Sequence, residues 1–214
     1  MSTEDIAVFI NNNLQVPLNE FIEGLINTSR HKVFTSNTVT PYKLPPWVDM
    51  IKVFAVASGA NGYNGSIPPS NMGGSGASGG PAGSYVIDRF IPIVPGEELT
   101  IVVGAGNTII TGSVSGPLLA LAKGSGTAGS PGVQITDGYI GGAGGLGGYI
   151  PNAIINSTPG AGGPGGTNLT PCGNPGGNGT GYGSGGGGAG GSYRNSNCFS
   201  NGGQGGSGII IISW

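Results

Sequence analysis

Hydrophobic and polar positions follow two different periods along the chain, and the period changes near residue 33. In the N-terminal segment, Pro17 is followed by apolar residues at spacings of three and four, which predicts an amphipathic helix beginning at the proline. The apolar stripe of this helix consists of Leu18, Phe21, Ile22, Leu25 and Ile26. His31 follows beside Arg30 and Lys32, where a solvated polar helix end is expected.

From residue 33 onward, apolar and polar residues alternate with a period of two, which predicts β-strands. The expected strands cover residues 33–40, 50–57, 84–94, 98–103, 109–114, 118–122 and 209–214. Pro92 places the third strand at a sheet edge or breaks it, because proline cannot donate a ladder hydrogen bond. The closing apolar run is typical of a buried strand, which needs partners far upstream. We therefore expect an N-terminal helical segment, residues 1–32, and one domain, residues 33–214.

Residues 124–208 hold 33 of the chain's 48 glycines and only two charged residues, Asp137 and Arg194. Glycine brings no apolar area and loses the most backbone entropy on ordering, so this region is either disordered or ordered through its backbone. Glycines recur at three-residue spacing, as at Gly185, Gly188 and Gly191, which fits extended helices that hydrogen-bond to each other. The expected fold is mainly β, with a glycine-rich bundle of polyglycine or polyproline-II-like helices and a short N-terminal α-helical segment.

The apolar stripe must be covered, and the sequence leaves two alternatives. The stripe packs either on the domain that follows it or on another subunit. We expect the second, because the glycine-rich body offers few large side chains to receive a helix. The five stripe residues are therefore the expected attachment site.

Two cysteines, Cys172 and Cys198, lie 26 positions apart in the glycine-rich region. A disulfide between them would close a loop and stabilise the fold by a few kcal/mol in the chain-entropy model. Two free thiols are the alternative, as in a protein folded in a reducing cytoplasm. The N-terminus lacks the pattern of a cleaved signal peptide, which favours synthesis in a cytoplasm.

Charge and motif content favour a protein without catalytic, cofactor or metal sites. The net charge is −2 and only 7% of residues are charged, so nothing attracts the chain to nucleic acid. His31 is the sole histidine, and no His/Cys cluster predicts a metal site. Glu97 and Glu98 are neighbours beside a Pro-Gly turn, which places them on opposite strand faces or in solvent. The Gly-x-Gly-x-x-Gly pattern occurs without the helix and acidic residue of a nucleotide site, so composition explains it.

Segments rich in Tyr, Asn, Ser and Thr interrupt the glycine runs at residues 62–71, 149–158, 167–174 and 193–201. Rigid aromatic side chains beside small hydrogen-bonding residues are typical of antibody binding loops. Ordinary turn chemistry uses the same residue types and remains an alternative at each position. The candidate receptor-binding residues are Tyr63, Tyr149, Asn152, Asn156, Tyr193, Arg194, Asn197 and Phe199.

Two stretches carry a resemblance to a known family. The stretch GSYVIDRFIPIVPGEELTIVVGAGN, residues 83–107, and the closing GGQGGSGIIIISW, residues 202–214, flank the long glycine segment. Together with the strand at 50–57, they resemble the glycine-rich domain of bacteriophage tail fibres and tail-tip adhesins, over about residues 33–214. The resemblance implies a layered bundle of polyglycine II helices whose connecting loops bind the bacterial surface. The N-terminal helices are not part of that pattern.

The resemblance implies a virion protein, made in the host cytoplasm, that recognises a bacterial surface glycan or outer-membrane protein. Its N-terminus would join other tail or fibre proteins, and assembly as a homo-oligomer is left open. The alternative is a structural decoration or fibre component of the virion without a receptor of its own. An adhesin would bind host cells as an isolated protein, whereas a decoration protein would bind only virion subunits.

Overall fold

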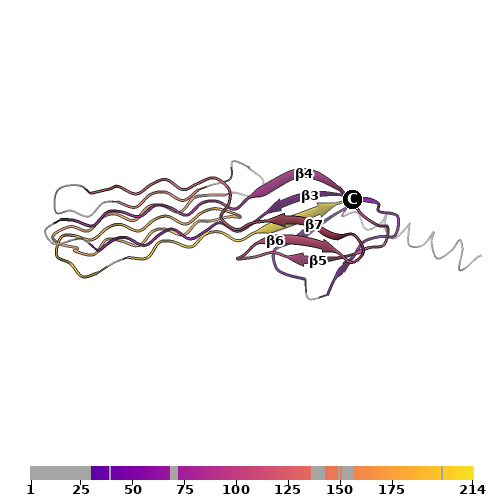
Figure 1. Cartoon of the computed structure of the whole chain (residues 1–214), viewed down its shortest axis with the longest axis horizontal. Helices are drawn as coiled ribbons and strands as arrows, with labels where there is room; N and C mark the ends of the chain where they lie inside the picture. Colours follow the sequence, from indigo (N-terminus) through magenta and orange to yellow (C-terminus); the bar gives the residue numbers. More distant parts are fainter. Residues whose placement is uncertain are drawn as a thin grey trace, which may run out of the picture.

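A computed structural model describes residues 30–38, 40–67, 72–135, 143–148, 150, 157–198 and 200–214. These residues form eight strands in two four-stranded antiparallel sheets, and the described part of the chain contains no helix. The expectation of a mainly β fold is confirmed, while the expected N-terminal helix lies outside the described residues. Figure 1 shows the sheets at one end of an elongated molecule and long glycine-rich traces running from them to the other end.

Sheet A has the strand order β1-β8-β3-β4. Its strands are β1 His31–Phe34, β8 Ile209–Ser213, β3 Met50–Val56 and β4 Tyr85–Pro92. The closing strand β8 lies between β1 and β3, with Ile210 opposite both Phe34 and Ala55. The expectation that the terminal strand pairs far upstream is confirmed. β4 is an edge strand that ends at Pro92, where the missing N–H does no harm.

Sheet B has the strand order β2-β5-β6-β7. Its strands are β2 Tyr42–Lys43, β5 Glu98–Val102, β6 Thr108–Gly112 and β7 Gly116–Leu121. One hydrophobic cluster joins the inward-facing residues of both sheets. Its fully buried members include Ile51 and Val53 of β3, Ile212 of β8, and Leu99 and Ile101 of β5. The two sheets therefore pack face to face as a sandwich.

The expected strand over residues 33–40 is confirmed only at Val33 and Phe34, because beyond them the chain crosses from sheet A to sheet B. β1 starts at His31, which is thus an exposed strand residue rather than a helix end, and stops at Phe34. Beyond it, Asn37 Oδ1 accepts a hydrogen bond from Val103 N at 2.8 Å, and Thr38 N donates to Ile101 O at 3.0 Å. These polar side chains attach the segment to β5 and end its pairing with β8.

Glu97 is only 2% exposed, whereas its neighbour Glu98 is exposed, so the two side chains face opposite sides, which is one of the two alternatives that the sequence predicts. The Glu97 carboxylate accepts hydrogen bonds from Val114 N at 2.9 Å, from Ser115 N at 2.6 Å and Ser115 Oγ at 2.9 Å, and from Val94 N at 3.2 Å. Burial raises the pKa of Glu97, but these hydrogen bonds outweigh it and hold the pKa below its ordinary value. The carboxylate thus fastens the β6–β7 turn to the start of β5.

Glycine-rich segments extend from one end of the sandwich (Figure 1) and are called here the glycine array. The array comprises residues 58–66, 74–83, 124–133, 143–148, 157–166, 173–179, 183–192 and 202–208. Backbone hydrogen bonds join neighbouring segments, as where Gly188 N donates to Gly145 O at 2.8 Å and Gly163 N donates to Gly188 O at 2.9 Å. Among the described residues outside the named strands, the only ladder-type pairing is an isolated bridge between Thr158 and Thr180.

The segment 183–192 lies at the centre of the array, and all of its residues are buried. The N–H groups of residues 185–190 within it donate to three neighbouring segments over distances of 2.7 to 3.0 Å. The donor–acceptor pairs are Gly185–Gly148, Gly188–Gly145, Gly186–Ala60, Ala189–Tyr63, Gly187–Gly177 and Gly190–Asn174. Its carbonyl groups accept hydrogen bonds from three other segments, 74–83, 157–166 and 202–208. The central segment therefore contacts six others and returns to each at every third residue.

Glycine is required where these backbones touch. A Cβ added at Gly188 would lie 2.0 Å from Ala77 O, and one added at Gly144 would lie 2.0 Å from Gly188 O. By contrast, a Cβ at Gly106 in the sandwich would meet nothing within 4 Å. The three-residue spacing of glycines in the sequence thus coincides with close backbone approach between segments.

Candidate functional site

Three connecting loops meet at the end of the array that lies far from the sandwich (Figure 1). They are residues 63–67, 166–174 and 192–202, and together they are called here the distal tip. Gly65 N donates to Ser200 O at 3.0 Å, and Gly202 N donates to Asn64 Oδ1 at 3.1 Å, which joins the first loop to the third. Tyr193 N donates to Pro171 O at 2.7 Å, which joins the third loop to the second. Loops distant in sequence thus form one surface.

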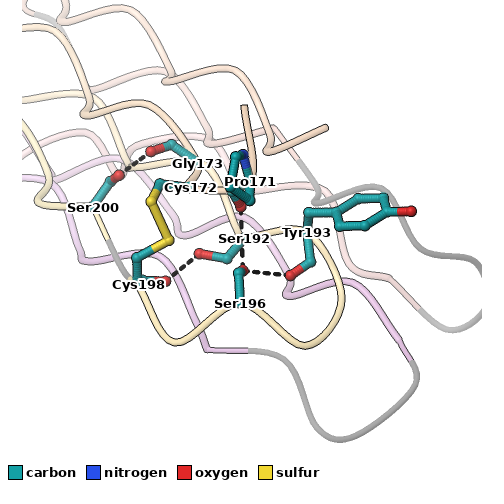
Figure 2. Close-up of a disulfide and its surroundings, with 8 residues drawn as sticks. All are labelled: Pro171, Cys172, Gly173, Ser192, Tyr193, Ser196, Cys198 and Ser200. Atoms are coloured by element: carbon teal, nitrogen blue, oxygen red, sulfur yellow. Dashed lines mark hydrogen bonds between the residues drawn. A yellow bond between two sulfur atoms is a disulfide. The ribbon is translucent and has the colours of Figure 1, made fainter. Parts of the chain in front are cut away.

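A disulfide between Cys172 and Cys198 crosses the distal tip, with the two Cα atoms 5.5 Å apart (Figure 2). Of the two alternatives left open by the sequence, the structure therefore has the bonded pair. The bridge ties the loop 166–174 to the loop 192–202 through a loop closure of 26 positions. In the chain-entropy model, closure of that length contributes about 3 to 4 kcal/mol.

Serine hydroxyl groups surround the disulfide and bond to nearby carbonyl groups (Figure 2). Ser196 Oγ donates to Pro171 O at 3.2 Å, Ser192 Oγ donates to Cys198 O, and Ser200 Oγ donates to Gly173 O. Each bond satisfies a backbone carbonyl in a segment that has no regular ladder. The serines in this tyrosine- and asparagine-rich loop therefore stabilise the turn.

The distal tip collects four of the candidate residues: Tyr63, Tyr193, Arg194 and Asn197. Tyr63 is 61% exposed and Asn197 is exposed, while Tyr193 and Arg194 are half-buried. In Figure 2 the Tyr193 ring points away from the disulfide. The tip therefore presents aromatic, amide and guanidinium groups on one rigid base.

The other candidate residues, Tyr149, Asn152, Asn156 and Phe199, lie outside the described residues, as do the stripe residues Leu18, Phe21, Ile22, Leu25 and Ile26. Parts of the loop 149–158 are described and lie at the sandwich end of the array. Ile150 is buried in a small cluster with Phe54 and Val56 of β3. The structure thus brings the described parts of the loops 62–71, 167–174 and 193–201 together but separates the ends of the loop 149–158 from them.

Sequence reasoning missed two apolar residues of the distal tip, Leu169 and Ile67. Leu169 is 92% exposed and Ile67 is also exposed. The signal in the sequence was a single large apolar residue within a stretch of small polar residues. A loop has no core of its own in which such a side chain could be buried. Large apolar side chains held in solvent are typical of contact surfaces when they gather at one place.

Arg194 is the only charged residue in the described loops of the distal tip. Across the described residues, no three His, Cys, Asp or Glu side chains lie together as a metal site would require. No helix in the described part of the chain is long and apolar enough to cross a membrane. The tip can bind through ring stacking, amide hydrogen bonds and one guanidinium group.

A family model for a glycine-rich domain matches residues 35–186. The match begins just after β1, passes through both sheets and ends inside the central segment of the array. Because it covers more than half of the chain, the protein belongs to this glycine-rich domain family. No curated protein matches the chain.

Proposed function

We propose that the protein is a bacteriophage tail-fibre or tail-tip adhesin that recognises the host bacterial surface through the distal tip. The observation that carries the proposal is the gathering of Tyr63, Tyr193, Arg194 and Asn197 at the far end of the array. Hydrogen bonds join the loop of Tyr63 to the loop 192–202, and the Cys172–Cys198 disulfide joins that loop to residues 166–174. The resemblance of residues 83–107 and 202–214 to phage adhesin domains supports the same function.

The glycine array acts in this proposal as a bundle of polyglycine II helices. A helix of this kind has three residues per turn and no internal hydrogen bonds, so its N–H groups point in three directions and return to each neighbour at every third residue. The recurrence along residues 183–192 supports this conformation, as does the absence of room for a Cβ at Gly144 and Gly188. The bundle holds the tip loops at a distance from the sandwich.

The ligand of the distal tip is a bacterial surface glycan or an outer-membrane protein. Tyrosine rings provide contact area at low entropic cost, and neighbouring amide and hydroxyl groups provide hydrogen bonds. The opposite end, where the N-terminal segment joins β1, attaches to other virion proteins of the tail or fibre. The protein acts in the virion, after synthesis in the host cytoplasm, by binding alone and without catalysis or a cofactor.

Binding of the isolated full chain to host cells tests the proposal. We expect the purified protein to bind cells of the bacterium that its phage infects and to compete with the phage for them. Tyr193→Ala and Arg194→Ala should each weaken cell binding at least tenfold, whereas Val114→Ala, an exposed site on the sandwich, should not. A wild-type protein that ignores host cells and binds only virion subunits would instead be a decoration or fibre component.

A further inference from the structure

The outer face of sheet A is covered at one end and bare at the other. Near the glycine array, Phe54 is only 8% exposed because it packs in the cluster with Ile150 and Tyr182. Toward the other end of the same face, Phe90 is 63% exposed and Met50 is also exposed. The described residues thus leave large apolar side chains of this face in solvent.

Sheet B provides the contrast. Leu99 and Ile101 of β5 face the core, so Glu98, Thr100 and Val102 lie on the outer face, where two of the three are polar. An antiparallel sheet with polar outward residues is stable against water. The bare end of sheet A lacks this pattern, which is typical of a surface that another element covers.

The bare end contains a groove of about 300 Å³ lined by Met50, Lys52, Phe90, Ser213 and Trp214. Lys52 Nζ lies 2.9 Å from Asp88 Oδ1, so its charge is paired outside the groove while its apolar stem forms part of the wall. The groove can therefore receive an apolar side chain without burying an unpaired charge.

The N-terminal segment enters the fold beside this groove. One row of paired residues crosses the outer face, with His31 opposite Ser213, Ser213 opposite Lys52, and Lys52 opposite Phe90. With neighbouring strands about 4.8 Å apart, the row is roughly 14 Å wide from His31 to Phe90. Every position in the groove thus lies close to the first residue of β1.

We propose that the apolar stripe Leu18, Phe21, Ile22, Leu25 and Ile26 docks on this groove in the same chain. Ile26 is four residues before Arg30, whose carbonyl accepts a hydrogen bond from Trp214 N at 3.0 Å. Four extended residues span at most about 14 Å, so the C-terminal end of the stripe must lie within about that distance of Arg30 and Trp214. A helix over residues 17–28 would be about 18 Å long, enough to cross the sheet.

The short connection also favours docking within one chain over docking between chains. A partner held by a short tether acts at an effective concentration on the order of millimolar, which a second copy does not reach in dilute solution. The sandwich thus provides an apolar surface on which the stripe can pack. The composition of the glycine-rich body did not predict this surface. This inference is independent of the proposed adhesin function, and a carrier protein would then contact the docked helix.

Chemical cross-linking of the full chain tests the docking. A chain carrying Ile22→Cys and Ser213→Cys should form a cross-link within one molecule when treated with a short bismaleimide, because the native cysteines are already paired. The matched control pairs Ile22→Cys with Thr100→Cys on the outer face of sheet B and should react at least tenfold less. A cross-linked dimer would assign the stripe to a second copy and overturn the proposal, as would equal yields from the two pairs.

Amide exchange provides a second measurement. Residues 17–27 should be protected in the wild type and exchange at least tenfold faster in Phe90→Asp, which places a charge in the groove. Val102→Asp, at an exposed site on sheet B, should leave that protection unchanged. Both substitutions are at exposed positions and should preserve the sandwich. Unprotected residues 17–27 in the wild type, or equal rates in the wild type and Phe90→Asp, would overturn the proposal.

Discussion

At the scale of single residues, Glu97 stabilises the sandwich through its charge. Its folded-state pKa is lowered by hydrogen bonds from Ser115, Val114 and Val94, whereas in the unfolded chain it is close to the ordinary value of about 4.3. A carboxylate with a depressed pKa contributes stability above the unfolded pKa, and this contribution is lost as the pH falls through the folded pKa.

Glu97→Gln should therefore destabilise the protein by about 1.5 to 3 kcal/mol at pH 7, because an amide turned toward backbone donors replaces a charged acceptor. The difference from wild type should shrink as the pH falls from the unfolded pKa of about 4.3 toward the lower folded pKa, because only the unfolded chain binds a proton in that range. Urea unfolding at several pH values measures both effects. Glu98→Gln at the exposed neighbour is the control and should change stability by less than about 0.5 kcal/mol. A loss that stays constant across this pH range would contradict the role of charge.

Glycines of the array should be intolerant of even one methyl group. We expect Gly188→Ala and Gly144→Ala to destabilise by about 1 to 3 kcal/mol through overpacking, because the added carbon would press against a carbonyl oxygen of the next segment. Gly106→Ala, in open space, should be neutral or stabilising by up to about 1 kcal/mol, since alanine lowers the entropy of the unfolded chain. Thermal melting compares the three variants, and equal shifts would rule out close backbone packing at the array sites.

At the scale of elements, alternation predicts the strands well where a side chain faces a core. The predicted strands at residues 50–57 and 98–103 match β3 and β5 to within one residue. The prediction at residues 33–40 failed beyond Phe34 because Asn37 and Thr38 bond to β5 through their side chains, a tertiary contact that leaves no periodic signal.

The candidate site could be predicted in composition but not in arrangement. Tyr63 and Tyr193 stand out from a glycine-rich background, which is why sequence reasoning selected them. That the two loops meet depends on which array segments are neighbours, and glycine has no side chain through which a sequence could encode the choice. The position of Ile150 near the sandwich was unpredictable for the same reason.

The disulfide should stabilise the distal tip more than the sheets. Replacing both Cys172 and Cys198 with Ser is expected to lower the free energy of local opening of the distal tip by about 3 kcal/mol. Amide exchange should rise in residues 193–198 and stay unchanged in β3 and β5, whose hydrogen bonds lie at the other end of the molecule (Figure 1). An equal rise in the sheets and in the tip would show that the disulfide supports the whole fold.

At the scale of the whole molecule, the two ends can be separated experimentally. A chain that lacks residues 1–29 keeps every strand and the whole glycine array, so we expect it to remain folded with an exposed groove on sheet A. It should lose its place on the virion yet still compete with phage for host cells through the distal tip. Circular dichroism, particle composition and a competition assay measure the three outcomes. An unfolded truncated chain would place the N-terminal segment in the core, and a folded one that fails to compete would favour a decoration protein.

The central segment 183–192 also sets the order of events during biosynthesis. Its hydrogen-bonding partners include residues 58–66 near the start of the domain and residues 202–208 near its end, and β8 follows directly after them. Neither the core of the array nor sheet A can be completed before residues 202–213 have been made. Contacts of such large sequence separation slow folding, since the chain must close long loops before it gains any stabilising contact. The central segment and sheet A therefore form only once residues 202–213 are available, rather than segment by segment as the chain emerges from the ribosome.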